Sequence, residues 1–148
     1  MIKPFLPLLL LITHFAFSQS LPIDFENNIV TADFVDFDGG TASVLANPQS
    51  SGINTSATVA QIVRDGGAIW SGSKIYLTDN LEFSSMNIIT MKVFTSAPVG
   101  TVVKFKLEGA GNTEHDAQTS VSGAWEELSW DFTGEPTNFN TLVFMFDF

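Results

Sequence analysis

Apolar and polar residues alternate in short runs over most of this chain, with the period of two that is typical of β-strands. Clusters of Gly, Asn, Ser and Pro interrupt the runs about every ten residues. Helical periodicity is hard to find after Gln19, although 58–64 is also compatible with one turn of helix. The pattern predicts strands near 22–26, 30–37, 41–46, 58–64, 74–78, 87–95, 102–108, 114–121, 125–132 and 141–148.

Many short strands with regular spacing predict a single all-β domain, an antiparallel β-sandwich of the jelly-roll type, over residues 19–148. The last strand, 141–148, is apolar on both faces apart from Asp147, as expected for a central strand that is covered on each side. No turn follows this strand before the sequence stops at Phe148. We therefore expect a C-terminally truncated sandwich that lacks its last strand.

Two of the predicted strands place lysines on their polar faces, and the seven-residue loop 95–101 predicts that they form a hairpin. A hairpin would bring Lys92, Lys104 and Lys106 onto one outer face. These lysines would bind an acidic polysaccharide, or form a mixed polar groove with acids such as Glu127. The alternative is a solvated strand face whose lysines discourage aggregation. The apolar residues of the opposite, inward faces are Ile89, Met91, Val93, Val103, Phe105 and Leu107, and Glu108 lies with the lysines.

Aromatic residues supply the other candidate binding groups. In "GAWEELSWDF" (123–132), alternation assigns Trp130 to the core and places Trp125 with Glu127 on the polar face. A partly exposed indole at 125 would stack on a sugar ring, or else cover the end of the core as a lid. Trp70, between glycines in "GGAIWSGSK", either contacts a ligand at a loop rim or anchors its loop, and Tyr76 is expected to be structural.

The N-terminus predicts the compartment. Residues 1–18 combine Lys3, an apolar run and small residues before an expected cleavage at Gln19, which together predict a secretory signal peptide. No second apolar run follows, so we expect a protein that is secreted or displayed at the cell surface. Without Lys3, five cations face 16 acids, a formal charge of −11 that disfavours nucleic acid and anionic membranes as partners. The chain has no cysteine, so it must hold together by packing or by a bound metal.

Carboxylates near the N-terminus are candidates for a calcium site. Asp24 and Glu26 fall on one side of the first predicted strand, and Asp33, Asp36 and Asp38 follow. Calcium takes six to eight oxygens, often from carboxylates and backbone carbonyls. "DFDGG" lacks the spacing of an EF-hand loop, so solvated edge acids are the alternative.

Catalysis is not expected. His115 is the only histidine after residue 18, and no Ser–His–Asp set or zinc spacing surrounds it. Glu126 and Glu127 face opposite sides of a strand, so they cannot form a glycosidase pair. Glu114 and Asp116 share a face and resemble part of the acid strand of jelly-roll glycanases, but the third expected acid is Gln118.

Three stretches carry a resemblance to a known family: "NPQSSGINTSATVAQIVRDGGAIWSGSKIYL", "MKVFTSAPVGTVVKFKLEG" and "GAWEELSWDFTG". They resemble a carbohydrate-binding-module-like β-sandwich of secreted Bacteroidetes proteins, a galactose-binding-like jelly roll often attached to glycanases in polysaccharide utilisation. The resemblance implies non-catalytic glycan binding and a structural Ca²⁺, for which Glu26 matches the first-strand ligand. The resembling domains complete that site with an Asp-Asp pair in a final strand, which this sequence does not contain.

These observations together predict an exported, monomeric domain that binds polysaccharide and holds a degradative protein near its substrate. The expected glycan-facing surface consists of Trp125, Lys92, Lys104, Lys106 and Glu127, with Trp70 at a loop rim. The alternative is a structural or adhesive extracellular spacer without glycan affinity, whose lysines would be neutralised by neighbouring acids.

Overall fold

The computed structural model describes residues 21–146, and the predicted leader 1–18, its cleavage at Gln19 and the final residues 147–148 lie outside the described part. A 3₁₀ turn, η1, comes first and nine strands follow it in the described residues. The bounds are η1 Thr31–Asp33, β1 Val35–Phe37, β2 Gly40–Ala46, β3 Thr58–Arg64, β4 Gly72–Tyr76, β5 Ile88–Phe94, β6 Val102–Gly109, β7 Asn112–Gln118, β8 Trp125–Asp131 and β9 Phe139–Phe146.

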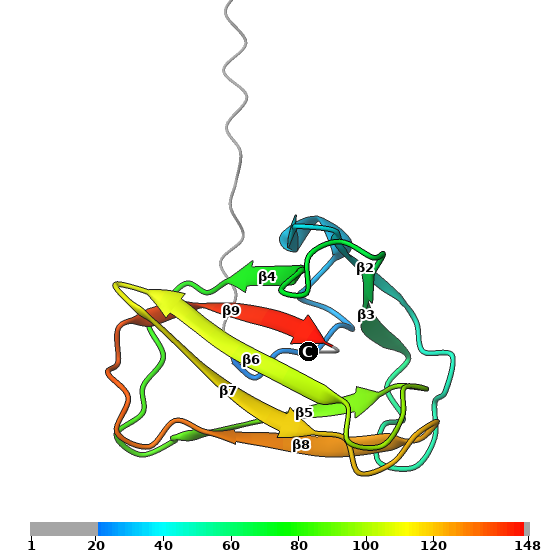
Figure 1. Ribbon diagram of the computed structural model, residues 1–148. Helices are drawn as coiled ribbons and strands as arrows, with labels where there is room; N and C mark the ends of the chain where they lie inside the picture. Colours follow the sequence, from blue (N-terminus) through cyan, green and yellow to red (C-terminus); the bar gives the residue numbers. More distant parts are fainter. Residues whose placement is uncertain (1–20, 147–148) are drawn as a thin grey trace, which may run out of the picture.

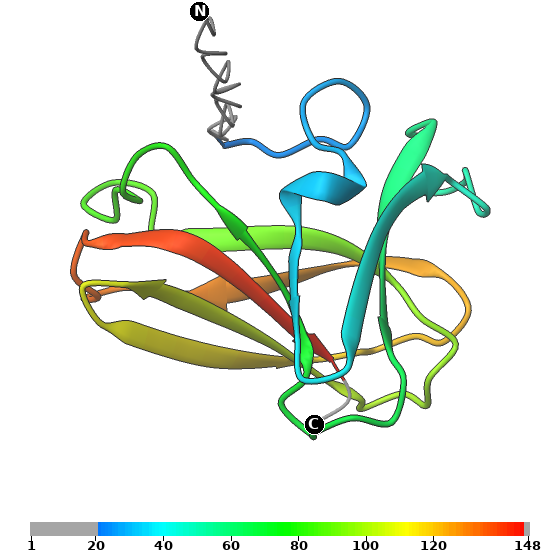
Figure 2. The same ribbon diagram turned by 90° about the horizontal axis from the view of Figure 1, so that it is seen from above.

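The strands form an antiparallel β-sandwich, as predicted (Figure 1). One layer is a five-stranded sheet in the order β1-β4-β9-β6-β7, and the pair β5-β8 faces it across the core. The β2-β3 hairpin stands at one end of the two layers (Figures 1 and 2). The predicted strand 58–64 is β3, so the helical alternative for this segment is wrong.

Aromatic side chains from both layers make the centre of the core. The ring of Phe105 on β6 lies 5.4 Å from that of Trp130 on β8 and 5.4 Å from that of Phe144 on β9. The Trp130 indole N–H donates to the Val103 carbonyl at 3.2 Å, which joins the two layers. Phe132 is fully buried beside them. The assignment of the inward-facing residues of β6 and β8 from alternation is therefore confirmed.

The strand β9 is central in its sheet, between β4 and β6, and is buried on both faces. Leu142 and Phe144 point into the core, whereas Val143 and Met145 lie on the outer face and are still 2% and 4% exposed. The apolar character of this strand on both faces therefore follows from its position, as the sequence predicted.

The predicted hairpin of 87–95 with 102–108 is wrong. β5 pairs with β8, whereas β6 pairs with β7 and β9. The intervening loop bonds to the segment after β7 instead of closing a turn: Gly100 donates to the Thr119 carbonyl at 2.8 Å, and Gly123 donates to the Thr95 carbonyl at 2.7 Å. Seven residues are long enough to cross the roughly 10 Å between two packed sheets, so the loop carries the chain from one layer to the other.

The N-terminal strands are also shorter than predicted. Residues 22–26 do not form a strand, and the chain turns over 25–28, where the backbone N–H groups of Glu26 and Asn27 donate to the Asp24 carboxylate. The predicted strand 30–37 contains the 3₁₀ turn η1 and only the short strand β1. Local side-chain hydrogen bonds thus replace sheet pairing in this region.

Candidate functional site

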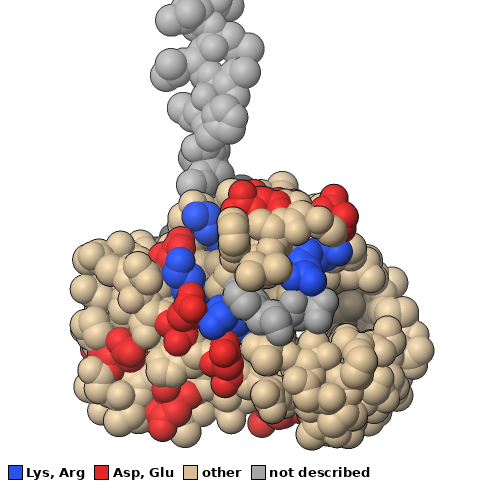
Figure 3. Space-filling view, in the orientation of Figure 1, with Lys and Arg blue, Asp and Glu red and all other residues tan. Residues whose placement is uncertain are grey.

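The outer face of the five-stranded sheet places its polar side chains in rows across the strands. The register aligns Lys74 on β4 with Val143 on β9, and Val143 with Lys106 on β6. The same row ends at Glu114 on β7. Because directly paired residues point to one side of a sheet, these side chains share a surface. Figure 3 shows basic and acidic side chains interspersed over this face.

The lysines of this face are held in ion pairs. Lys104 Nζ lies 3.0 Å from Glu114 and 2.8 Å from Asp116. Glu108 takes one oxygen to Lys106 at 2.9 Å and the other to Lys74 at 3.5 Å. The Lys104 side chain is only 12% exposed, so the network lies partly below the surface.

The ion pairs shift the pKa values of their members. The hydrogen bond from Lys106 lowers the pKa of the Glu108 carboxyl below its ordinary value of 4.5; burial opposes this effect and Lys74 reinforces it. Burial alone would lower the pKa of Lys104, but its hydrogen bonds to Asp116 and Glu114 outweigh this effect and raise the pKa above 10.5. Both charged states are thus favoured by folding.

These shifts predict how stability depends on pH. The depressed pKa of Glu108 contributes stability that is present above pH 4.5 and is lost as pH falls through the folded-state value. The raised pKa of Lys104 contributes stability that is present below pH 10.5 and is lost above it. The melting temperature, measured from pH 3 to pH 11, should therefore be nearly constant at intermediate pH and fall at both the acidic and the alkaline end. The Glu108 contribution is at most about 5 °C, because partly exposed pairs are worth roughly 1 kcal/mol or less.

The variant Glu108→Gln supplies the control for this prediction. At acidic pH the melting temperature of this variant should fall less steeply than that of the wild type. A residual fall is expected from groups such as Glu126. Burial alone would raise the pKa of Glu126, but hydrogen bonds from Ser120 and Val121 outweigh this effect and lower it. An equally steep fall of the melting temperature at acidic pH in this variant would contradict the stabilising role of the Glu108 ion pairs.

A depression of about 360 Å³ lies on this face beside Trp70. Trp70 is 54% exposed, and its indole N–H donates to Asp38 at 2.9 Å. The loop that carries Trp70 approaches the turn before β2 so closely that only glycine fits at position 67. A Cβ there would lie 2.0 Å from the Asp38 carbonyl oxygen. The indole is thus held in place while its ring stays accessible. The lining residues are Phe37, Asp38, Trp70, Lys106, Glu108, Glu114, Val143 and Met145.

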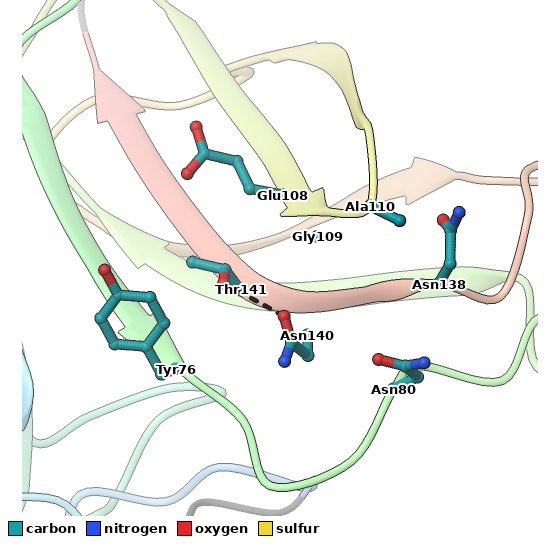
Figure 4. A pocket seen from close by; sticks show the side chains of 8 residues that line it. All are labelled: Tyr76, Asn80, Glu108, Gly109, Ala110, Asn138, Asn140 and Thr141. Carbon is teal, nitrogen blue, oxygen red and sulfur yellow. Dashed lines mark hydrogen bonds between the residues drawn. The ribbon is translucent and has the colours of Figure 1, made fainter.

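A second, wider depression of about 560 Å³ adjoins the first at Glu108, which lines both (Figure 4). Tyr76 stands at one side, 51% exposed, with the Lys74 ammonium 5.6 Å from its ring centre. Figure 4 shows that three asparagines from the loop after β4 and from the start of β9 supply amide groups. The lining residues are Tyr76, Asn80, Glu108, Gly109, Ala110, Asn138, Asn140 and Thr141. We call the two depressions together the outer groove.

The structure divides the predicted surface between the two outer faces of the sandwich. Lys104, Lys106 and Trp70 belong to the face of the outer groove. Lys92 on β5 is paired in register with Glu127 on β8, in the other layer. The expectation of one face with all three lysines is therefore wrong, because the strands that carry them are not neighbours.

Trp125 lies on the β5-β8 face in a half-buried position. Its indole N–H donates to the Gln49 carbonyl at 2.7 Å, and its ring lies 5.6 Å from that of Phe94. Gln49 is 76 residues away in the sequence, so the indole fastens the long loop between β2 and β3 to the sandwich. These contacts favour the lid alternative for Trp125 over the sugar-stacking alternative.

The candidate calcium ligands are engaged with the backbone. Asp24 accepts from the N–H groups of Glu26 and Asn27 at 3.1 and 3.3 Å, and Glu26 accepts from the Ala57 N–H. Within residues 21–146, no cluster of three or more acidic, histidine or cysteine side chains is positioned to hold a metal. Calcium at Asp24 and Glu26 stays a prediction.

Sequence reasoning missed the wider half of the outer groove. Tyr76 was expected to be structural, yet half of its surface is exposed. The alternation of Lys74 and Tyr76 along β4 was an available signal that both point outward. Asn80, Asn138 and Asn140 gave no such signal, because they lie in loops or at a strand start and meet only through the pairing of β4 with β9.

The fold and groove define an antiparallel β-sandwich with an open polar groove on one outer face. No protein-family model and no curated protein matches the chain. The part of the chain that the structure describes has no helix with the length and hydropathy of a membrane span.

Proposed function

We propose that this protein binds polysaccharide without cleaving it, and that the binding surface is the outer groove. The observation that carries this proposal is the presence of exposed aromatic rings together with hydrogen-bonding groups in two adjoining depressions. Trp70 and Tyr76 are each more than half exposed, and Glu108 links the depressions beside them. An exposed aromatic ring suits the C–H face of a sugar ring, and the side chains around it suit the hydroxyls at the sugar's edge.

The groups of the outer groove are well matched to sugar hydroxyls. Amides carry both donors and acceptors, carboxylates accept and ammonium groups donate, so the lining can bond hydroxyls in either role. Most of these groups stand on paired strands, which hold them in place before a ligand arrives and lower the entropy cost of binding. The groove is open along the sheet, as a polymer requires.

The contacts of three acids on this face support the proposal of binding without cleavage. Glycoside hydrolysis uses two carboxyl groups across the scissile bond, one with a raised pKa. Glu108 instead has a lowered pKa, and Glu114 and Asp116 both pair with the one amine of Lys104. These contacts support a binding role in preference to a catalytic one.

The proposed biological role is that of an exported, monomeric targeting domain. Outside the cell, such a domain would keep a degradative protein close to its insoluble or polymeric substrate. This role follows the predicted signal peptide and the family resemblance.

A structural or adhesive spacer is the second candidate. The ion pairs favour a spacer, because a spacer is expected to have lysines that neighbouring acids neutralise. Lys104 and Lys106 are both paired in this way. The exposed aromatics of the outer groove favour binding, since a spacer has no need for them.

Retention in gels that contain polysaccharide separates the two candidates. We expect slowed migration on at least one of a set of plant or algal polysaccharides. The double variant Lys92→Ala/Glu127→Gln, on the opposite face, should migrate like the wild type. Free migration of the wild type on every polymer would contradict the proposal and leave the spacer.

A further inference from the structure

The ionic groups of the outer groove and its surroundings are matched to one another. Glu108 faces both Lys74 and Lys106, and Lys104 lies between Glu114 and Asp116. Asp38, which accepts from Trp70, adds a further carboxylate to this face. The whole chain has a formal charge of −10 at pH 7. An approaching polyanion therefore meets three lysines on this face that are already paired with carboxylates.

An acidic sugar that pairs with one of these lysines would either displace the carboxylate already bound there or lie beside it at a remaining N–H donor. Both outcomes place two anions next to each other, which costs free energy. A hydroxyl has no such cost. The ammonium group of Lys106 has three N–H donors and is paired with Glu108. Its remaining donors can bond a sugar hydroxyl while this ion pair stays intact.

The spacing of the two exposed aromatic residues along the sheet suits several sugars of a chain better than a single sugar. Gly72, two residues beyond Trp70, and Tyr76 are four residues apart on β4, which corresponds to roughly 13 Å at the rise of a strand. That length exceeds one sugar ring, so Trp70 and Tyr76 would contact different residues of one chain.

We propose that the outer groove selects an uncharged polysaccharide chain over acidic ones. This inference rests on the proposed function and adds the class of ligand. It differs from the sequence-based hypothesis that the lysines bind an acidic polysaccharide, because the lysines of this face are already paired with carboxylates.

Affinity electrophoresis with the full chain tests this selectivity. The neutral polymers are mixed-linkage β-glucan, xylan and galactomannan; the acidic polymers are alginate, polygalacturonate and carrageenan. We expect retention on at least one neutral polymer, equal at low and high salt because no counterions are released, and free migration on the acidic polymers. Salt-sensitive retention that is stronger on an acidic polymer would overturn the selectivity while the proposed function stands. Free migration on all six polymers would overturn both.

The variant Glu108→Gln tests the cause of the selectivity. It leaves Lys74 and Lys106 without their carboxylate, so we expect retention on an acidic polymer that disappears at high salt. Glu127→Gln on the opposite face makes the same change in charge and should have no such effect. A melting temperature within a few degrees of the wild type confirms that each variant is folded. A folded Glu108→Gln variant with unchanged behaviour on the acidic polymers would overturn the proposed role of the ion pairs.

Discussion

Replacing Trp70 with alanine is expected to weaken polysaccharide binding about 30-fold, which corresponds to the loss of about 2 kcal/mol typical of a central aromatic contact. Trp70 is 54% exposed and lines the outer groove, so its ring is available to a ligand. The fold should change little, because exposed side chains contribute little to stability. Calorimetric titration with an oligosaccharide of the retained polymer measures the loss, and a thermal melt checks the fold.

Two matched variants sharpen the Trp70 prediction. Ile69→Ala removes an even more exposed apolar side chain, 62%, from the same loop without touching the groove, and should bind like the wild type. Trp70→Phe keeps an aromatic face but loses the hydrogen bond to Asp38, so its affinity should fall between those of the wild type and Trp70→Ala. If Trp70→Ala bound the polysaccharide with wild-type affinity, the proposed contact between the Trp70 indole and the sugar would be contradicted.

The largest loss of stability is expected for Trp130→Ala. Trp130 is 2% exposed, packs on Phe105 and donates to the Val103 carbonyl, so the substitution leaves a cavity and removes a hydrogen bond between the layers. Truncation of a buried tryptophan costs about 3–5 kcal/mol, a large share of the roughly 5–15 kcal/mol that stabilises a typical domain. The melting temperature should fall by about 10–20 °C.

The two tryptophans of strand β8 provide an internal comparison. Trp125 is half-buried and fastens a loop, so Trp125→Ala should cost about 1–2 kcal/mol, clearly less than Trp130→Ala. Denaturant unfolding of both variants gives the two free energies. A larger loss at Trp125 than at Trp130 would contradict the assignment of Trp130 to the core and Trp125 to the lid.

The sandwich could be predicted from the sequence because strand periodicity is a local property. Alternation correctly placed Phe105 and Trp130 inward, and the apolar run of β9 correctly indicated a central strand. The strand predicted at 22–26 was wrong because alternation does not register a competing local contact: the N–H groups of Glu26 and Asn27 donate to the Asp24 carboxylate in place of sheet pairing.

Strand pairing could not be predicted because a short loop is compatible with both a hairpin and a crossover. The loop 95–101 has the length of a hairpin connection, yet its backbone bonds to residues 119 and 123. Lys92 thereby lies in a different sheet from Lys104 and Lys106, which divides the predicted surface. The ion partners of Lys104 on β6 also depend on strand pairing, since Glu114 and Asp116 come from the next strand.

The central claim is that the outer groove is the glycan-binding surface, and an NMR titration tests it most directly. Assigned backbone and indole resonances would be followed as a neutral oligosaccharide is added. We predict shifts at Trp70, Tyr76, Lys106 and Glu108, with Lys92, Trp125 and Glu127 unchanged. Shifts confined to the β5-β8 face, or no shifts while the polymer is retained, would contradict the claim.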